Sequence, residues 1–175
     1  MMVLTIILSG CFPLPEGACS IDTLLISETA LPKGIFEETG SRSADSAPAR
    51  VGIEKIGTSF SSFDQGGLVH DVYRFRGIDE ANSEFEDVAH YYFVPRKSET
   101  DWLIPADLVP LPIQADKYKV ACTTIKEKNV EICQYVAQYG KYVTYLNVNM
   151  IALDHTDLLF IVQDIDHRFL NCFAD

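Results

Sequence analysis

The sequence predicts an α+β fold in which a mainly antiparallel sheet of about five strands carries two helices and two disulfides. Three observations lead to this prediction. Segments that alternate between apolar and polar residues are joined by short turns, as in hairpins. Two segments, one after Gly77 and one after Asp154, repeat apolar residues at helical spacing. The strands and helices follow one another without the long crossovers that a parallel sheet requires.

Composition limits both the size of the core and the class of partner. A chain of 175 residues usually forms one domain, and 47 % apolar with 22 % charged residues is typical of a packed globular protein. The 25 acidic residues outnumber the 14 basic ones, which gives a net charge of −11. Such a surface repels nucleic-acid phosphates and anionic lipid headgroups. We therefore expect no nucleic-acid partner, and any membrane attachment must have another cause.

The first eleven residues resemble the end of an export signal. Residues 1–10 are uncharged and mostly apolar. They are too few for a transmembrane helix, which needs roughly 20 apolar residues, but suit the apolar region of a secretory signal. Leu8-Ser9-Gly10-Cys11 resembles the lipobox of bacterial lipoproteins. The resemblance implies that residues 1–10 are the remnant of a signal peptide and that Cys11 Sγ carries lipid. The alternative is a buried N-terminal strand with Cys11 as a core thiol.

The residues around this signal refine the prediction. A signal peptide normally opens with Lys or Arg, yet the first basic residue is Lys33, so we expect basic residues upstream of the given start. Pro13, Pro15 and Gly17 suit a tether better than a strand. The expected organisation is a lipid-anchored tether and lead-in over residues 11–50, followed by a single domain over 51–175.

The remaining cysteines predict two disulfides. With Cys11 lipidated, four cysteines are left, an even number that suggests two bridges outside the cytoplasm. Cys122 and Cys133 flank the polar turn KEKN symmetrically, so a hairpin places them opposite each other, within bridging distance. Cys19 is then left for Cys172. The alternative is four reduced thiols in a cytosolic protein. The pair C-x10-C has no histidine at ligand spacing, so no metal site is expected.

The first half of the domain predicts a hairpin and a helix. Residues 51–60 and 66–75 have strand character and flank a turn with two glycines, whereas residues 40–50 are typical of a loop. Asp79 is the expected N-cap of a helix that ends before Pro95. Its apolar stripe consists of Ala81, Phe85, Val88, Ala89 and Tyr92.

The second half predicts three strands and a final helix. Residues 95–112 contain four prolines and the only Trp, which indicates an ordered crossing loop or short irregular strands. Strands are expected at 116–125, 130–139 and 141–150, with a tight turn at Gly140. Asp154 or Thr156 is the expected N-cap of the last helix. Its buried face comprises Leu158, Leu159, Ile161, Val162, Ile165, Phe169, Cys172 and Phe173.

Two known folds share this order of elements. Over residues 51–175 the layout loosely resembles the PsbP/Mog1-like sandwich. It is also similar to the disulfide-stapled extracellular sensor domains of bacterial receptor kinases, in which a cysteine hairpin such as that of Cys122 and Cys133 precedes an aromatic hairpin and a terminal helix. Neither resemblance supplies catalytic residues.

The acidic and histidine-containing segment 154–167 is the strongest candidate for chemistry. His155 and His167 lie twelve residues apart, which on a helix separates them by about 18 Å. Asp154 and Asp157 fit helix capping, and the pair Asp164 and His167 needs no function on an exposed face. A hydrolase using this segment is therefore an alternative, while no catalytic residue, metal or cofactor is assigned.

The other histidines and the tyrosines have structural explanations too. His70 and Asp71 are adjacent on a strand and should point to opposite faces. His90 is expected at or near the surface of its helix. A recognition surface is possible on the aromatic residues of the last two strands, although cross-strand packing accounts for them as well. The residues concerned are Tyr135, Tyr139, Tyr142 and Tyr145, together with Trp102.

These observations favour a membrane-anchored lipoprotein that displays one acidic domain outside the cytoplasm. Its expected role is that of a non-enzymatic sensor-like or binding module. The partners would be the membrane, through lipid such as palmitate on Cys11, and another protein or a small ligand. An accessory subunit of a membrane complex is the further alternative to a hydrolase.

Overall fold

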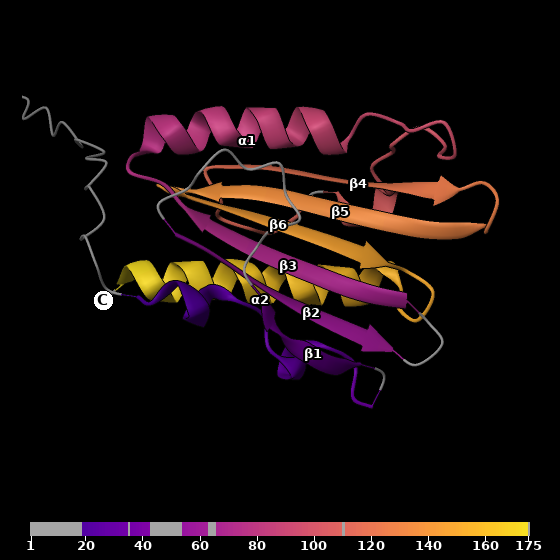
Figure 1. Cartoon of the computed structure of the whole chain (residues 1–175), viewed down its shortest axis with the longest axis horizontal. Helices are drawn as coiled ribbons and strands as arrows, with labels where there is room; N and C mark the ends of the chain where they lie inside the picture. The colour runs from indigo at the N-terminus through magenta and orange to yellow at the C-terminus, as the bar shows by residue number, and fades with distance from the viewer. Residues whose placement is uncertain (1–18, 35, 43–53, 63–65, 110, 175) are drawn as a thin grey trace, which may run out of the picture.

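A computed structural model describes residues 19–34, 36–42, 54–62, 66–109 and 111–174. Its centre is one antiparallel sheet in the order β1-β2-β3-β6-β5-β4 (Figure 1), and the predicted α+β class is confirmed. The strands are β1 (Glu37–Arg42), β2 (Glu54–Ser62), β3 (Gly66–Arg74), β4 (Lys117–Ile125), β5 (Val130–Tyr139) and β6 (Tyr142–Asn149). The helices are α1 (Ile78–Tyr92) and α2 (His155–Ala174), with short 3-10 helices η1 (Ile21–Leu24), η2 (Glu28–Ala30) and η3 (Ala106–Leu108).

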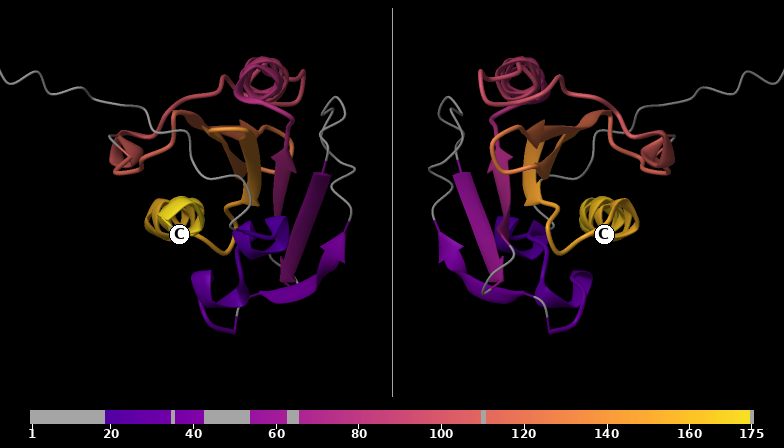
Figure 2. Two further views of the ribbon diagram at one scale, coloured as in Figure 1. Left: turned by 90° about the vertical axis from the view of Figure 1, so that its left-hand side faces the viewer. Right: turned by 90° about the vertical axis from the view of Figure 1, so that its right-hand side faces the viewer.

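The two long helices cover opposite faces of the sheet. Successive strand residues point to opposite sides, so Tyr135 packs in the core under α2 while Val136 packs in the core under α1. In Figure 1 α2 lies behind the sheet, and Figure 2 shows both helices nearly end-on, separated by the strongly twisted strands. The result is a three-layer arrangement with two apolar cores.

Helix α1 begins earlier than expected. Its N-cap is Gly77, in an extended conformation, rather than Asp79, which lies in the first turn with Glu80. Glu80 Oε2 accepts a hydrogen bond from the backbone N–H of Arg76, so an acidic side chain still pairs with a backbone donor at the start of the helix. The predicted apolar stripe is buried against the sheet.

Helix α2 begins with a reciprocal cap. Asp154 Oδ1 accepts from the backbone N–H of Asp157, and Asp157 Oδ2 accepts from the backbone N–H of Asp154, at 2.9 and 3.0 Å. This is the capping-box geometry, here with an aspartate at its third helical position. Asp154 is therefore the N-cap, as one of the two expected positions. The cap fixes His155 as the first residue of the helix.

Part of the predicted tether and lead-in, residues 11–50, packs as part of the fold. Leu24 of η1 is fully buried in the α2 core, and β1 pairs with β2 as a sixth strand. The apolar side chains of Ile21–Leu24 are buried because η1 packs beside α2 against β2 and β3. Residues 19–34 and 36–42 thus belong to the fold. The lipobox and residues 11–18 of the predicted tether lie outside the described residues.

Both predicted disulfides are confirmed. The short bridge joins Cys122 of β4 to Cys133 of β5, which are directly paired across the hairpin with Cα atoms 4.0 Å apart. The long bridge joins Cys19 to Cys172 of α2, with Cα atoms 5.5 Å apart. Figure 1 shows the first described residues beginning beside the end of α2. The turn after β5 is also as expected, with Gly140 at φ 55°.

The proline-rich segment 95–112 crosses beside the edge strand. Leu103 and Cys122 exchange two backbone hydrogen bonds, of 2.9 and 2.8 Å, and Glu99 bridges to Ile125. The segment therefore covers the outer edge of β4, which would otherwise present unpaired backbone groups. It then forms η3, which places Asp107 near the start of α2. The expectation of an ordered crossing loop agrees with this course.

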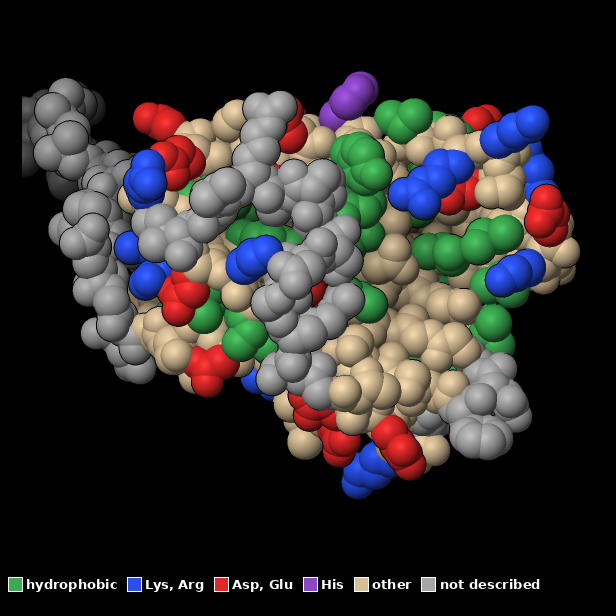
Figure 3. Space-filling view, in the orientation of Figure 1, with side chains coloured by type: hydrophobic (Ala, Val, Ile, Leu, Met, Phe, Trp, Pro, Cys, Tyr) green, Lys and Arg blue, Asp and Glu red, His purple; other side chains and the backbone are tan. Residues whose placement is uncertain are grey.

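The surface is mixed in character. Acidic and basic side chains are interspersed on the face shown in Figure 3, and hydrophobic side chains reach the surface around the end of α1 and the segment after it. Within the part of the chain that the structure describes, none of the helices combines the length and the apolar character needed to cross a membrane.

Candidate functional site

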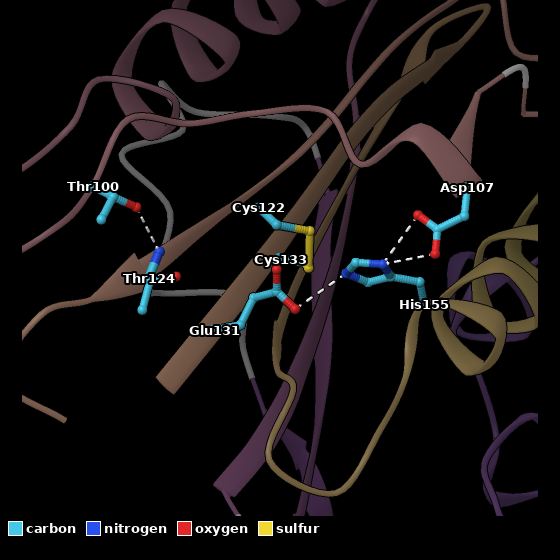
Figure 4. Close-up of a disulfide and its surroundings, with 7 residues drawn as sticks. All are labelled: Thr100, Asp107, Cys122, Thr124, Glu131, Cys133 and His155. Carbon is cyan, nitrogen blue, oxygen red and sulfur yellow. Dashed lines mark hydrogen bonds and ion pairs between the residues drawn. A yellow bond between two sulfur atoms is a disulfide. The ribbon is translucent and has the colours of Figure 1, made fainter. Parts of the chain in front are cut away.

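Three parts of the fold meet at one end of the sheet and bring their polar side chains together. The hairpin β4–β5 supplies Glu131 beside the short bridge, η3 supplies Asp107, and α2 supplies His155 (Figure 4). Glu131 and Cys133 are two residues apart on β5, so they point to the same face, the face covered by α2. We call Asp107, Glu131 and His155 the His155 cluster.

His155 lies between two carboxylates. Its Nδ1 is 2.9 Å from Asp107 Oδ2, and its Nε2 is 3.1 Å from Glu131 Oε2. The His155 side chain is 25 % exposed, compared with 63 % for Asp107 and 40 % for Glu131, so the cluster is open to solvent on the side of the acids. A protonated imidazole donates to both acids, whereas a neutral one donates to only one of them.

The acids determine the charge of this imidazole. Partial burial alone lowers the pKa of His155, because it disfavours the charged form. The hydrogen bond to Asp107 and the negative charge of Glu131 act in the opposite direction and prevail, so the pKa of His155 is raised above its usual value. The two acids of the cluster therefore favour the protonated form of His155.

The short bridge belongs to the same site. One ligand atom each from Cys122, Glu131, Cys133 and His155 lies within 4.8 Å of the other three. The cysteines are buried, while Glu131 and His155 are partly exposed. The sequence has no histidine at ligand spacing from C-x10-C, because His155 follows Cys133 by twenty-two residues and reaches it only through the packing of α2. Sequence spacing carries no signal for this contact.

A second polar site lies along α2. A pocket of roughly 220 Å³ is lined by Asp166 and His167 together with Pro112, Gln114, Gln163 and Leu170. Asp166 is only 3 % exposed, and its Oδ1 accepts from the Gln114 backbone N–H and from Tyr139 Oη, both at 2.9 Å. Tyr139 Oη is in turn 3.1 Å from Tyr135 Oη. Burial raises the pKa of the Tyr139 hydroxyl, so it stays a donor.

The acidic segment 154–167 is divided between these two sites. His155 belongs to the cluster beside the short bridge, whereas His167 lines the pocket next to Asp166. Asp164 pairs with Arg168 at 2.6 Å instead of with His167. The two histidines therefore lie in different sites, in agreement with the separation that the helical spacing predicted.

The tyrosines do not form one exposed surface. Tyr135, Tyr139 and Tyr142 are buried under α2, where Tyr139 stacks on Phe169 with ring centroids 4.2 Å apart. Tyr145 is buried under α1 and stacks on Tyr92, also at 4.2 Å. Trp102 packs against the α1 core. These side chains therefore pack in the two cores of the sheet, which was the alternative to a recognition surface.

The remaining histidines occupy the positions expected for them. His70 points into the α2 core while Asp71 faces the other side of the sheet, and both are fully buried. The backbone N–H of Ile26 donates to His70 Nδ1 at 3.2 Å, and His70 Nε2 lies 2.7 Å from Thr144 Oγ1. Burial lowers the pKa of His70 to about 3, so it is neutral. His90 is exposed on α1.

Comparisons with known proteins identify the fold. No protein-family model matches the chain. A search of curated proteins finds no match either. Among solved structures, the chain is similar to the extracellular domain of PknH, a receptor kinase from Mycobacterium tuberculosis, with a TM-score of 0.57 and 11 % identity. The match covers 85 % of this chain and 94 % of that one. The predicted similarity to receptor-kinase sensor domains is confirmed at the level of the fold.

Proposed function

We propose that this protein is a lipoprotein, anchored through Cys11, that displays a sensor-like binding domain outside the cytoplasmic membrane. The observation that carries the proposal is the pair of disulfides, since bridges of this kind form and persist in oxidising compartments. The lipobox sequence and the likeness to an extracellular domain support the same location. Non-enzymatic binding is the role that fits a domain whose histidines are divided between two sites.

The long bridge supports close attachment to the membrane. Cys19 follows Cys11 by eight residues, a length that spans at most about 26–29 Å when fully extended. Because Cys19 is bonded to Cys172, lipid on Cys11 would hold the end of α2 within that distance of the bilayer. The His155 cluster, at the other end of α2, would then be the part of this helix that is farther from the anchor.

Two surface features support a binding role. The pocket beside Asp166 offers a buried carboxylate, two glutamines and a histidine to a small polar ligand. The end of α1 and the segment after it expose apolar side chains to a protein partner, namely Tyr91, Val94, Leu103, Ile104 and Val109. The pocket is the more specific of the two features, because its polar groups converge on one space.

Lipid labelling in cells tests the anchor. Cells producing the full chain are fed an alkyne analogue of palmitate, and the purified protein is assayed for its incorporation. We expect labelling of the parent chain and of Ser9→Ala, which keeps a small residue before the cysteine, and loss of labelling in Cys11→Ala. Equal labelling of Cys11→Ala and the parent chain would refute the proposal.

A further inference from the structure

We propose that the reduced form of the short bridge is a zinc site, in which Cys122, Cys133, Glu131 and His155 bind one Zn²⁺ ion. The disulfide and the metal site use the same two sulfur atoms, so they exclude each other. The inference goes beyond the proposed binding role and does not depend on the lipid anchor. It rests on the geometry of four side chains that already converge in the bridged protein.

The four ligand atoms are close to the spacing that zinc requires. Zinc in proteins is tetrahedral, with bonds of about 2.3 Å to sulfur and about 2.0–2.2 Å to nitrogen or oxygen, which places the ligand atoms about 3.3–3.8 Å apart. In the bridged protein the corresponding atoms of Cys122, Glu131, Cys133 and His155 all lie within 4.8 Å of one another. Opening the bridge lets the two sulfurs separate, and small side-chain rotations then complete the tetrahedron.

The positions of these ligands come from regular structure and not from loops. Cys122 and Cys133 are a directly paired position of the β4–β5 hairpin, and Glu131 is two residues before Cys133 on the same face. His155 is fixed by the reciprocal cap of Asp154 and Asp157 at the start of α2. The nine cross-strand pairs of this hairpin keep the cysteines opposite each other without the sulfur bond.

Asp107 has the role of a positioning residue in this arrangement. Histidines that bind zinc commonly donate their other ring N–H to a carboxylate, which fixes the tautomer and the ring orientation. Asp107 lies 2.9 Å from His155 Nδ1, so the Nδ1–H donates to Asp107 and the Nε2 lone pair points toward Glu131 and the sulfurs (Figure 4). The metal would thus replace the present contact of 3.1 Å between Nε2 and Glu131.

The chemistry balances with a dithiol as the reductant. The dithiol gives two electrons and two protons to the Cys122–Cys133 bond, becomes a disulfide itself, and leaves two protein thiols. Zn²⁺ then displaces the two thiol protons, which go to solvent, and binds two thiolates, the Glu131 carboxylate and neutral His155. The ion offsets most of the negative charge of these ligands. The partly exposed side of Glu131 and His155 provides its path of entry.

Cobalt spectroscopy tests the site. The full chain carrying Cys11→Ala, which removes the one cysteine outside the two bridges, is reduced anaerobically with a phosphine, desalted and titrated with Co²⁺. We expect thiolate-to-cobalt charge-transfer bands and the intense visible bands of tetrahedral Co²⁺, both lost when Zn²⁺ is added. The unreduced chain should show neither. Failure of the reduced chain to bind either metal would overturn the proposal.

Variants separate this site from any other use of the thiols. Cys19→Ser with Cys172→Ser should keep the cobalt spectrum, and Cys122→Ser with Cys133→Ser should lose it. We expect His155→Gln and Glu131→Gln to weaken Zn²⁺ binding about tenfold or more and Asp107→Asn about 10–100-fold, whereas the exposed controls His90→Gln and Glu127→Gln leave it unchanged. Circular dichroism checks that each reduced variant is folded. Unchanged affinity in both His155→Gln and Glu131→Gln would overturn the four-ligand site.

Discussion

The two disulfides lie near opposite ends of the same helix and have different surroundings. At the C-terminal end of α2, the long bridge joins residues 153 positions apart and is packed among apolar side chains of the core. At the N-terminal end, the short bridge joins residues only 11 positions apart and is bordered by Glu131 and His155. The first closes nearly the whole domain, whereas the second closes a hairpin that nine cross-strand pairs already hold.

The nearest histidines differ in the same way. The N-terminal segment that the long bridge ties down covers His70, which is fully buried, neutral and hydrogen-bonded through both nitrogens. His155 beside the short bridge is partly exposed and lies between two acids that raise its pKa. The region of the long bridge is therefore closed to solvent around its histidine, while the region of the short bridge has a histidine and two carboxylates that solvent reaches.

Removal of the long bridge should have the largest effect. In the loop-entropy model, a closure of 153 positions destabilises the unfolded chain by about 5 kcal/mol. We therefore expect Cys19→Ser with Cys172→Ser to lower the free energy of unfolding by about that amount, measured by urea denaturation without reductant. Cys11→Ala, which touches neither bridge, is the control. A loss smaller than that from removing the short bridge would contradict the division of roles.

Removal of the short bridge should cost less. A closure of 11 positions corresponds to about 3 kcal/mol in the same model, so Cys122→Ser with Cys133→Ser should lower the free energy of unfolding by about 3 kcal/mol. Hydrogen exchange would locate the effect. We expect faster exchange in β4 and β5 and little change in η1, and the reverse preference when the long bridge is removed. Equal effects on all elements would show that the two bridges act on the same cooperative unit.

The elements of the fold could be predicted because their signals are local. The stripe of α1, the cap of α2 and the symmetric turn between Cys122 and Cys133 all depend on residues close in sequence. The first strand could not be predicted in this way. Glu37–Arg42 reads EETGSR, without apolar alternation, and it is a strand because it pairs at the edge of the sheet with β2. Edge strands need only one neighbour and a polar outer side.

The candidate site was predicted only in part, for a related reason. The two disulfides follow from spacing and elimination, but the partners of His155 lie 24 and 48 residues away along the chain. No periodicity connects η3, β5 and α2, so their contact is a product of tertiary packing alone. Tyr139 and Tyr145 look alike in sequence but lie on opposite faces of the sheet. Tyr139 pairs with Tyr142 across the Gly140 turn, and Tyr145, three residues further along β6, points to the other side.

The dependence of stability on pH tests the contrast between the two regions through His70. The folded protein holds His70 neutral with a pKa of about 3, whereas the unfolded chain binds a proton near pH 6.5. Below pH 6.5 the unfolded state therefore binds more protons, and stability falls as the pH decreases toward 3. Between pH 8 and pH 5 this one group should lower the free energy of unfolding by about 2 kcal/mol.

His70→Gln removes this dependence, although it also destabilises the core at every pH. We expect the loss of stability between pH 8 and pH 5 to be about 2 kcal/mol smaller in His70→Gln than in the parent chain, and unchanged in the exposed control His90→Gln. The carboxylates and His155, whose raised pKa acts with the opposite sign, are present in all three proteins and cancel in the difference. If His70→Gln does not fold, NMR of the parent chain gives the same information, since the His70 ring should not titrate above pH 4. A ring that titrates near pH 6.5 would mean that the segment held by the long bridge opens readily, and that this end of α2 is no more closed to solvent than the other.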